Sequence, residues 1–487
     1  MRIKSIQTNI GPFKNGLPLL PKDMQAQSSA NYTTVLIGAN GASKSLALRL
    51  LTDVCLGIAK YESDGHPVIT TTAKYQNENA PGKVIAISGT PLDRFPRGGR
   101  PGPTSMFTVH DRSPFIYIGQ KAVNGMAGSK QSERSLAYLF LKNVSRLPEA
   151  STEICAVFNR FALPTTVWIR FNLTKDVSTV DELIVAVQEA SSERRLRRAS
   201  ETASDYAAAF RFGMRILEDY DFAGEVFAKL LALQQIPWAS PISVTQPRPV
   251  NGRNPSHDVS NAESLYYLAL LRIIQFRDIA FDAQTPESRG RTPVENAVFG
   301  EDLSSGQWHW LSSMCGVALE AEDDCAILID EPENSLHPSW QRDYLPALHV
   351  MLARRTGCHV VVATHSALVA SSISSVSGCV LGLKRNGAGQ HPVVTSTLLE
   401  TTYGWNATDV LEEVFSMSST RAPEFSRVAD QALGLIADGK EKHILRLAEL
   451  VDEISELMLQ LPAHDPMRRV FISIIDEVKA PNNEGDA

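Results

Sequence analysis

Short runs of consecutive apolar residues recur along the chain, and most are followed by segments whose apolar residues return every three or four positions. The runs are typical of strands buried on both faces: TTVLI (33–37), FIYIG (115–119), CAILID (325–330), CHVVVATH (358–365) and GCVLGLK (378–384). The segments with helical spacing are 46–58, 308–321 and 339–355. Alternation of this kind predicts the α/β class, with a mostly parallel sheet and helices on its faces.

Three stretches depart from this alternation. Residues 60–113 read as an insertion that holds one strand, KVIAIS (83–88). A lobe follows in which 181–220 and 259–281 have helical spacing, with a strand expected at VWIRFNL (167–173). The tail from 405 to 479 reads as mostly amphipathic helix.

Composition and charge exclude several classes of protein. The chain has 487 residues, of which 43% are hydrophobic and 21% charged, as in ordinary globular proteins. A net charge of −7 excludes a histone-like binder of phosphate backbones, so any DNA contact requires a local basic patch. The six cysteines form no CxxC pair, which argues against zinc and fits a reducing cytoplasm. Neither a signal peptide nor an apolar run of about 18 residues is present, so we expect a cytoplasmic chain without a membrane span.

A Gly-rich loop, GANGASKS (38–45), lies between the first buried strand and a helix. It approximates the P-loop pattern GxxxxGK[ST], in which backbone N–H groups surround phosphate at a helix N-terminus. Lys44 is expected to reach the β- and γ-phosphates, and the Ser45 hydroxyl to bind Mg²⁺. The expected ATP-binding stretch comprises Gly38, Ala39, Asn40, Gly41, Ala42, Ser43, Lys44, Ser45 and Leu46. The alternative is a Gly-rich turn that merely caps a helix.

Ser43 departs from this pattern, which has glycine before the lysine. Its side chain stands where the backbone passes close to phosphate. We expect nucleotide binding to survive if Ser43 keeps a negative φ, and turnover to be slow.

Two adjacent carboxylates end the strand CAILID, within the segment AILIDEPENSLHP (326–338). This is the arrangement of a Walker B site. Asp330 is expected to hold Mg²⁺ through water, and Glu331 to orient or deprotonate the attacking water. The alternative, an acidic turn after a core strand, does not explain the P-loop on the same chain.

The segment DLSSGQ (302–307) opens the helix over 308–321 and is a near match to the ABC signature LSGGQ. Ser304, Ser305, Gly306 and Gln307 are expected to present a positive helix end to a γ-phosphate. A simple helix N-cap would use the same residue types.

Two further residues complete the expected site. His365 ends the strand CHVVVATH and is expected to contact γ-phosphate as a switch histidine, against the alternative of a structural histidine. Gln120 follows FIYIG and is expected to bind Mg²⁺ and couple nucleotide to the lobe, with Gln76 as its competitor.

In their order, GANGASKS, DLSSGQ, LIDEPENSLHP and ATHS resemble the motifs of the ABC-type ATPases of the SMC, RecF and overcoming-lysogenization-defect group. The wording LIDEPENSLHPSWQ, with KVIAISGTPLDRFP and YGWNATDVLEEVF, is most similar to the PtuA-like ATPases of the bacterial anti-phage system Septu, also found beside some retrons. The resemblance implies a P-loop core made of residues 1–130 and 296–400, an inserted helical lobe at 131–295 and a helical C-terminal region at 401–487.

The resemblance also implies a mechanism and partners. ATP and Mg²⁺ would be held between two copies joined head to tail, as a homodimer or a higher even oligomer, with the signature of each copy closing the other's site. A separate HNH nuclease subunit would be the regulated partner. Residues 385–487 lack the glutamate and DxD pattern of a Toprim nuclease. A RecF-like DNA repair ATPase and a nucleotide-gated scaffold with little hydrolysis remain as alternatives.

DNA contact is also suggested by a basic cluster on an expected helix. The cluster consists of Arg194, Arg195, Arg197 and Arg198. Such a cluster can bind DNA phosphates. Charge runs on helices are usually solvated faces, and Glu193 beside it favours that interpretation.

Overall fold

The chain folds into two compact units, Met1–Val410 and Leu411–Ala487. In the computed structural model the described residues are 1–21, 30–58, 60–61, 69–76, 79–96, 115–119, 130–192, 203–235, 238, 242–244, 256–282, 297–386, 393–399, 402–415, 417 and 419–479.

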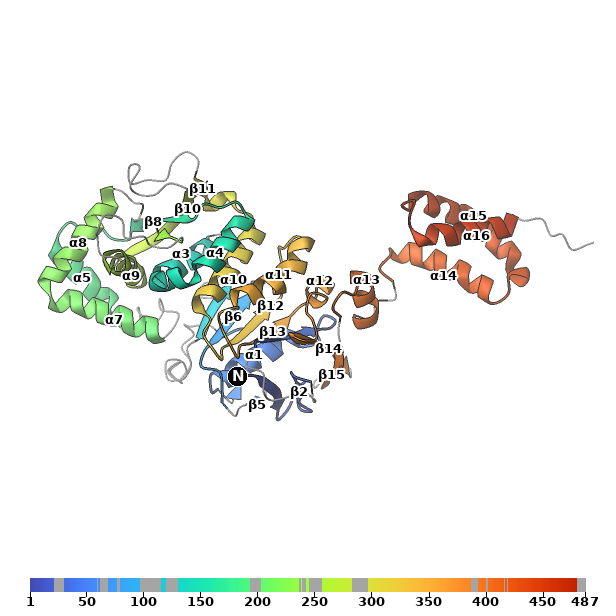
Figure 1. Ribbon diagram of the computed structural model, residues 1–487, viewed down its shortest axis with the longest axis horizontal. Coiled ribbons are helices and arrows are strands. Elements are labelled where there is room, and N and C mark those ends of the chain that lie inside the picture. The colour runs from blue at the N-terminus through green and yellow to red at the C-terminus, as the bar shows by residue number, and fades with distance from the viewer. Residues whose placement is uncertain are drawn as a thin grey trace, which may run out of the picture. The chain divides into compact units, whose positions relative to one another are not determined.

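A seven-stranded sheet forms the centre of the first unit (Figure 1), in the order β15-β14-β3-β13-β12-β6-β7. Neighbouring strands are parallel except for β14 and β15, so the mostly parallel α/β class is confirmed. The strands are β3 (Tyr32–Ile37), β6 (Val84–Ser88), β7 (Phe115–Gly119), β12 (Ala326–Asp330), β13 (His359–Ala363), β14 (Gly378–Asn386) and β15 (Val393–Leu399).

The strand β6 corrects the expected insertion at 60–113. Instead of belonging to an appendage, β6 pairs with β12 on one side and β7 on the other, inside the main sheet. All five of its residues are buried, which explains why KVIAIS has no polar position between Val84 and Ser88.

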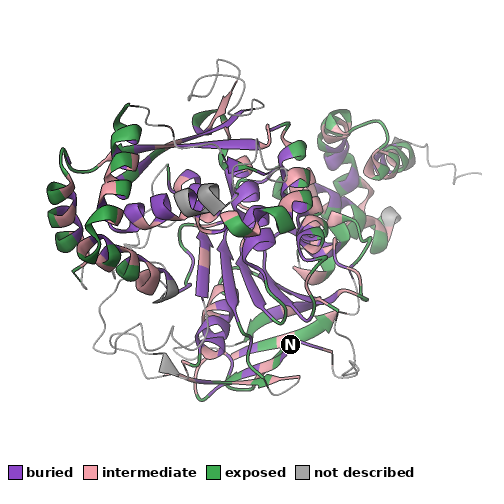
Figure 2. Cartoon of the chain, turned by 60° about the vertical axis from the view of Figure 1, so that its left-hand side comes forward, coloured by how far each residue is buried: buried purple, intermediate pink, exposed green. Residues whose placement is uncertain are grey.

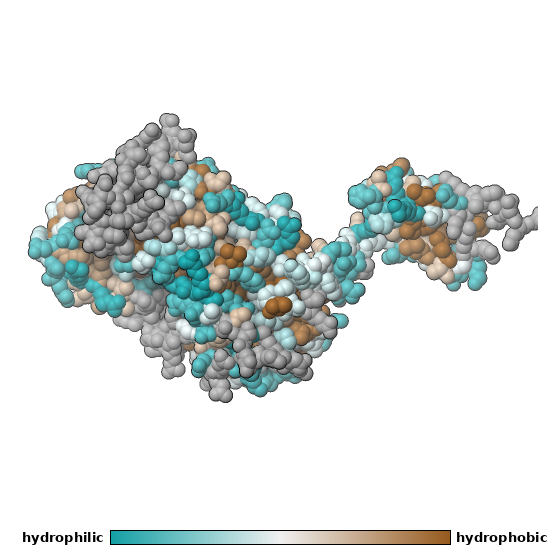
Figure 3. Space-filling model, viewed as in Figure 1, coloured by the Kyte–Doolittle hydropathy of each residue, from teal (hydrophilic) through white to brown (hydrophobic). Residues whose placement is uncertain are grey.

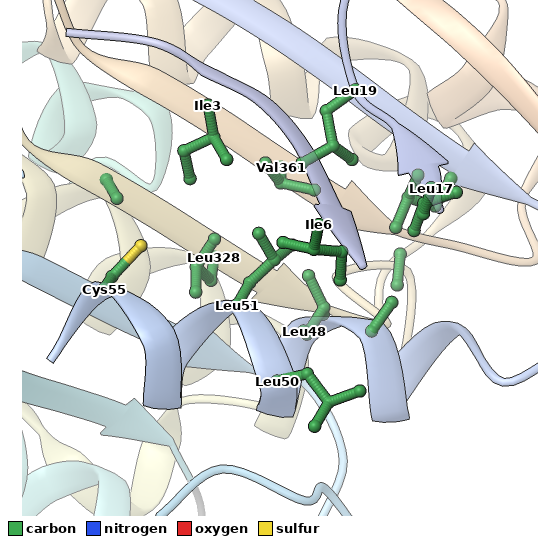
Figure 4. Close-up of a cluster of buried hydrophobic side chains, with 14 of the residues drawn as sticks. Ile3, Ile6, Leu17, Leu19, Leu48, Leu50, Leu51, Cys55, Leu328 and Val361 are labelled. Carbon is green, nitrogen blue, oxygen red and sulfur yellow. The ribbon is translucent and has the colours of Figure 1, made fainter. Parts of the chain in front are cut away.

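One face of the main sheet is covered by α1 (Lys44–Cys55), which also packs against a small antiparallel sheet of order β2-β1-β5-β4. In Figure 4, Leu51 of α1 lies between Ile6 of that small sheet and Leu328 of the main sheet, and Leu48 of α1 belongs to the same cluster. Packing between α1, the small sheet and the main sheet fixes the position of α1. It therefore also fixes the end of the P-loop, which leads into this helix. The small strands are β1 (Ile3–Thr8), β2 (Leu17–Pro18), β4 (Lys60–Tyr61) and β5 (Ile69–Tyr75).

Outside the lobe, the described part of the first unit contains four further helices, and the longest of them, α10, lies on the other side of the main sheet from α1. The helix α10 packs against β6, β7 and α11, and on the lobe helices α3 and α4. Figure 2 shows the central strands of the main sheet buried along most of their length, whereas β15 at its edge is mostly exposed or half-buried. The helices are α10 (Ser305–Glu320), α11 (Pro338–Met351), α12 (Ala367–Ala370) and α13 (Ala407–Asp409), the last followed by a π-helical turn (Val410–Val414).

The lobe contains a second antiparallel sheet, of order β11-β10-β8-β9, beside its helices. The expected helix over 259–281 is wrong in its second half, because α9 ends at Leu270 and 274–282 form β10. The expected strand at 167–173 is confirmed by β8. The strands are β8 (Thr166–Leu173), β9 (Ile242–Ser243), β10 (Ile274–Asp282) and β11 (Val298–Phe299). The helices are α3 (Gln131–Lys142), α4 (Leu147–Arg160), α5 (Val180–Ala190), α7 (Ala203–Glu218), α8 (Tyr220–Gln235) and α9 (Ser256–Leu270), with short 3-10 turns at Val144–Arg146 and Gly300–Asp302.

The second unit is formed by three amphipathic helices with their own core, as the helical tail predicts. They are α14 (Pro423–Ala437), α15 (Lys440–Gln460) and α16 (Pro466–Lys479). Residues 411–487 contain eight Lys and Arg against fifteen Asp and Glu, so this unit carries a charge equal to the net charge of the whole chain, −7. Figure 3 shows hydrophobic and hydrophilic side chains side by side on its visible face. Leu445 of α15 is 82% exposed.

Candidate functional site

The carboxyl ends of four strands meet at one edge of the main sheet. Asp330, the last residue of β12, is in register with Ser88 of β6 and Ala363 of β13, and Ala363 is in register with Leu36 of β3. The loops that leave these strands therefore start side by side. Crevices beyond the carboxyl ends of parallel strands are where α/β proteins bind ligands.

The P-loop leaves β3 at this edge and packs closely against β14. A Cβ on Gly38 would stand 2.3 Å from the Leu383 carbonyl oxygen, so only glycine fits there. Gly41 has φ +82°, in the left-handed region that favours glycine. The loop conformation therefore depends on both glycines of GANGASKS.

Ser43 takes φ +66° and ψ +24°, and directly precedes α1. The negative φ considered for this residue is therefore wrong. A left-handed conformation costs a residue with a side chain about 1–2 kcal/mol relative to the right-handed one. The backbone conformation at this position favours glycine, although the residue is serine.

Lys44 is buried at the first position of α1. Its ammonium donates to the Gly38 carbonyl oxygen at 2.8 Å and to Nε2 of His365 at 2.8 Å. Burial lowers the pKa of Lys44 to about 8, against the opposing effect of Glu333, Glu331 and Asp330. The lysine side chain thus lies beside the P-loop and contacts His365, two residues after the end of β13.

Ser45 and Asp330 meet at the same edge. The Ser45 hydroxyl donates to Oδ1 of Asp330 at 3.0 Å. Burial raises the pKa of Asp330 to about 7, with nearby Glu331, Asp93 and Glu333 acting in the same direction and Ser45 against them. A hydroxyl and a carboxylate converging in this way are oxygen donors of the kind that Mg²⁺ prefers, so these residues fit the expected ion.

Glu331 has a strained backbone. Its φ is +49°, uncommon for a residue with a side chain, and its N–H donates to the Ala363 carbonyl at 2.8 Å. A Cβ on Gly89, after β6, would stand 2.1 Å from the Glu331 carbonyl oxygen. The side chain accepts a 2.8 Å hydrogen bond from Asn334. Packing from β6 and β13 therefore holds this turn, and the half-buried Glu331 carboxylate, in place.

A second glutamate of the same loop was missed by the sequence analysis. Glu333 accepts hydrogen bonds from the Thr364 hydroxyl, at 2.8 Å, and from the His365 backbone N–H. It joins the loop after β12 to the end of β13, directly beside the histidine that Lys44 contacts. The available signal was the second glutamate in DEPEN, which motif matching did not use.

His365 is held at its backbone by Glu333 and at its ring by Lys44. Burial lowers the pKa of His365, the Lys44 ammonium acts in the same direction, and Glu331 opposes both. A neutral ring accepts the lysine proton, as the 2.8 Å contact requires. The residues bracketing the expected γ-phosphate position are therefore already in contact.

The DLSSGQ segment forms the expected start of α10. Ser304 is its N-cap, with a reciprocal capping box to Gln307: Gln307 N donates to Ser304 Oγ at 3.3 Å, and Ser304 N to Gln307 Oε1 at 2.8 Å. Gly306 is buried, and a Cβ there would stand 2.3 Å from the Ser335 carbonyl oxygen. Ser304 and Ser305 are exposed, and across the described residues no hydrogen bond joins them to the P-loop.

Gln120 lies outside the described residues, as do Arg194, Arg195, Arg197 and Arg198. The competitor Gln76 follows β5 in the small sheet, where its N–H donates to the Arg2 carbonyl at 2.8 Å. Among the described helices, none is long and apolar enough to cross a membrane.

Comparisons with known proteins bear on this arrangement. Residues 201–371 match a family model described as "AAA domain, putative AbiEii toxin, Type IV TA system", a stretch that includes DLSSGQ, Asp330 and His365 but not the P-loop. No curated protein matches the chain.

Solved structures similar to this chain include two SMC heads. One is the SmcHead bound to the C-winged helix domain of ScpA, with 11% identity, 82% of this chain and 98% of that chain covered, and a TM-score of 0.32. The other is the Smc head domain with an extended coiled coil bound to the C-terminal domain of ScpA derived from Pyrococcus furiosus, with 14% identity, 82% and 96% covered, and a TM-score of 0.30. Residues 201–371 are therefore similar to an AAA domain, and this stretch supplies Asp330 and His365 to the sheet edge at which the P-loop also lies.

Proposed function

We propose that this protein is a Mg²⁺-dependent ATPase whose nucleotide sites are completed when two copies meet head to tail. The observation that carries the proposal is the meeting of Lys44 with His365 and of Ser45 with Asp330 at one strand edge. If the segment after β12 were only an acidic turn, the Gly-rich loop only a helix cap and His365 only a structural histidine, nothing would require the three to meet at one edge.

The residues at this edge have complementary roles in the proposed site. Lys44 and the backbone N–H groups of 38–45 bind the phosphates, and Ser45 and Asp330 hold Mg²⁺, with Gln120 as a further ligand. When bound, Mg²⁺ neutralises charge on the phosphate oxygens. Glu331 orients or deprotonates the attacking water, and His365 contacts the γ-phosphate.

The closing group comes from a second copy. Ser304 and Ser305 lie exposed at the N-terminus of α10, where free N–H groups and the helix dipole favour a phosphate. Head-to-tail pairing of two copies uses the same surfaces twice and creates two equivalent sites. ATP then joins the copies, and hydrolysis releases them.

Phosphate release at saturating ATP tests the enzymatic part. Wild-type protein should turn over, and Lys44→Ala and Glu331→Gln should not. Glu218→Gln, an exposed carboxylate at the end of α7, serves as the matched control and should retain wild-type turnover. The proposal fails if wild type is as inert as Glu331→Gln.

The mass in solution tests the assembly. With ATP and Mg²⁺, Glu331→Gln should double in mass relative to the nucleotide-free sample, and a second change, Ser304→Arg, should prevent the doubling. A mass independent of nucleotide contradicts the ATP-bridged pair.

We further propose that the ATPase regulates a separate HNH nuclease in a bacterial anti-phage defence complex. Two features support this: the likeness of LIDEPENSLHPSWQ and YGWNATDVLEEVF to Septu-type ATPases, and a matched family whose description names a toxin. Co-purification of the native operon, followed by mass measurement, should reveal a stoichiometric HNH subunit. An operon of DNA repair genes would favour the RecF-like alternative.

A nucleotide-gated scaffold with little hydrolysis is the second candidate. The positive φ of Ser43 favours it, because a side chain at this step narrows the space left for phosphate. Nucleotide-dependent doubling of mass without phosphate release would support this candidate.

A further inference from the structure

The strand β14 extends beyond the main sheet and runs beside the P-loop. The last pair between β14 and β3 is Gly382 with Ile37. The residues that follow in both strands therefore lie beyond the carboxyl end of β3. In β3 the next residue is Gly38, where the P-loop begins. In β14 the strand continues to Asn386, supported by its antiparallel partner β15.

Two contacts show how closely this extension follows the loop. Gly38 packs on the carbonyl of Leu383, and the guanidinium Nη1 of Arg385 lies 3.6 Å from where a Cβ on Gly41 would stand. Alternate residues of a strand share one face. Leu381 and Leu383 are buried on the face towards α1, so Arg385 continues that face beyond the core, over the loop.

Among the described residues, Arg385 is a cation without a side-chain partner. It is exposed, and over the described ranges it forms no ion pair or side-chain hydrogen bond. The opposite side of the P-loop is acidic, with Asp330, Glu331 and Glu333 all acting electrostatically on Lys44. Lys44 and Mg²⁺ together leave part of the charge of a triphosphate uncompensated, and a guanidinium is suited to phosphate oxygens because it donates two parallel hydrogen bonds.

We propose that Arg385 is a second cationic ligand of the bound nucleotide, contacting its phosphate chain in the same copy that supplies Lys44. This inference rests on the proposed ATP site and adds a residue outside all of its sequence motifs. Its contact is to phosphate, so it contributes equally to adenine and guanine nucleotides.

Calorimetric titration of the full chain with Mg²⁺ and the imido analogue of ATP tests the proposal. Arg385→Ala should weaken binding about tenfold or more, the effect of losing a charged hydrogen bond. Arg385→Lys should recover part of the loss. Lys384→Ala is the matched control, since this neighbouring exposed cation lies on the opposite strand face, and it should bind like wild type. The imido analogue of GTP should show the same ratio between wild type and Arg385→Ala.

The outcomes separate this inference from the proposed function. If Lys44→Ala abolishes nucleotide binding and Arg385→Ala leaves it intact, the proposed role of Arg385 is refuted and the ATP site is not. Equal losses in Arg385→Ala and Lys384→Ala also refute it, since they indicate a general effect of surface charge. Wild-type protein that binds neither analogue refutes the ATP site and, with it, this inference. Thermal unfolding of each variant at the wild-type temperature confirms that the fold is retained.

Discussion

Lys44 and His365 are 321 residues apart in the chain, and their side chains meet at 2.8 Å. The parallel sheet produces this contact, because β3 and β13 are neighbours and each residue follows the carboxyl end of its strand. Both groups are basic, and the contact requires the histidine to be neutral. The pair marks the place where a γ-phosphate would be held between them.

Replacing Ser43 with glycine should stabilise the chain and speed hydrolysis. Glycine adopts the left-handed conformation at no steric cost. Glycine also gives the unfolded chain more conformational entropy, which offsets part of this gain. The net increase in the free energy of unfolding is about 1 kcal/mol. Removing the side chain also frees space beside the phosphates. Thermal unfolding and phosphate release measure the two effects.

The matched control is Ala162→Gly, an exposed residue with φ +52° outside the site. It should raise stability by a similar amount and leave phosphate release unchanged. If Ser43→Gly stabilises the chain but turnover stays at the wild-type rate, Ser43 does not limit hydrolysis.

Glu333→Gln should lower turnover about tenfold while nucleotide affinity changes little. The carboxylate accepts from Thr364 and His365 through two oxygens, whereas an amide has one acceptor, so one buried donor is left unpaired. His365 then loses its orientation, and the defect appears in kcat rather than in binding.

Thr364 offers graded controls for this experiment. Thr364→Ser keeps the hydroxyl and should behave like wild type, and Thr364→Val should show a smaller defect than Glu333→Gln. Full activity in Glu333→Gln would mean that His365 is positioned by other contacts.

Every strand of the main sheet except β15 could be predicted from the sequence, because these strands are largely buried, whereas β15 is mostly exposed or half-buried and was missed. Continuous apolar runs such as CAILID and CHVVVATH have no other simple explanation. In contrast, the strand β10 was not predicted from the sequence, because its pairing is irregular. Its pairing with β8 shifts register between Phe276 and Asp278, which breaks the alternation that would have indicated a strand. The end of α9 gave no signal either, because Arg272 takes φ +55° where a glycine would be expected.

The site was predictable only as far as its motifs. P-loop, Walker B and switch residues each carry local patterns, and the sheet brings them together. The role of Glu333 depends on a contact between two loops, and that of Arg385 on the overhang of one strand beyond its neighbour. The sequence shows that Glu333 follows the Walker B carboxylates but not which loop it contacts, and the overhang of β14 leaves no periodic or motif-like trace.

The contribution of two buried histidines to stability should fall as the pH drops from about 6.5 towards 4, whereas the raised pKa of Asp330 acts in the opposite direction over the same range. Burial lowers the pKa of His309 to about 4, against the Pro332 carbonyl, and burial also lowers that of His359. Between the folded and unfolded pKa values the unfolded chain binds more protons, so acid favours unfolding, by roughly 3 kcal/mol for a shift of this size. Thermal unfolding across this range measures the slope.

His309→Gln should flatten that slope, and His464→Asn, an exposed histidine of the second unit, should leave it unchanged. An unchanged slope in His309→Gln would show that its burial is not the source of the acid sensitivity.

The outer face of α15 should gain stability when its repulsive charges are reduced. Glu449, Asp452, Glu453 and Glu456 are exposed at like-charged i,i+3 and i,i+4 spacings. The double change Asp452→Asn and Glu456→Gln removes three such contacts, worth about 1 kcal/mol together. Amide exchange of α15 in the full chain should slow at low salt, and less so at high salt.

Glu449→Gln is the comparison, since it removes the ion pair with Arg446 as well as two repulsions, with Asp452 and Glu453, and should change amide exchange less than the double variant does. Equal slowing at low and high salt in the double variant would exclude an electrostatic cause.

Mixing two inactive variants tests the shared site most directly. Lys44→Ala lacks a working P-loop and Ser304→Arg a working signature, so each alone should release no phosphate. In an equimolar mixture, random pairing gives half of the dimers one intact site, and about one quarter of wild-type activity should return. A mixture as inert as its components, or Ser304→Arg active by itself, would contradict a site completed by a second copy.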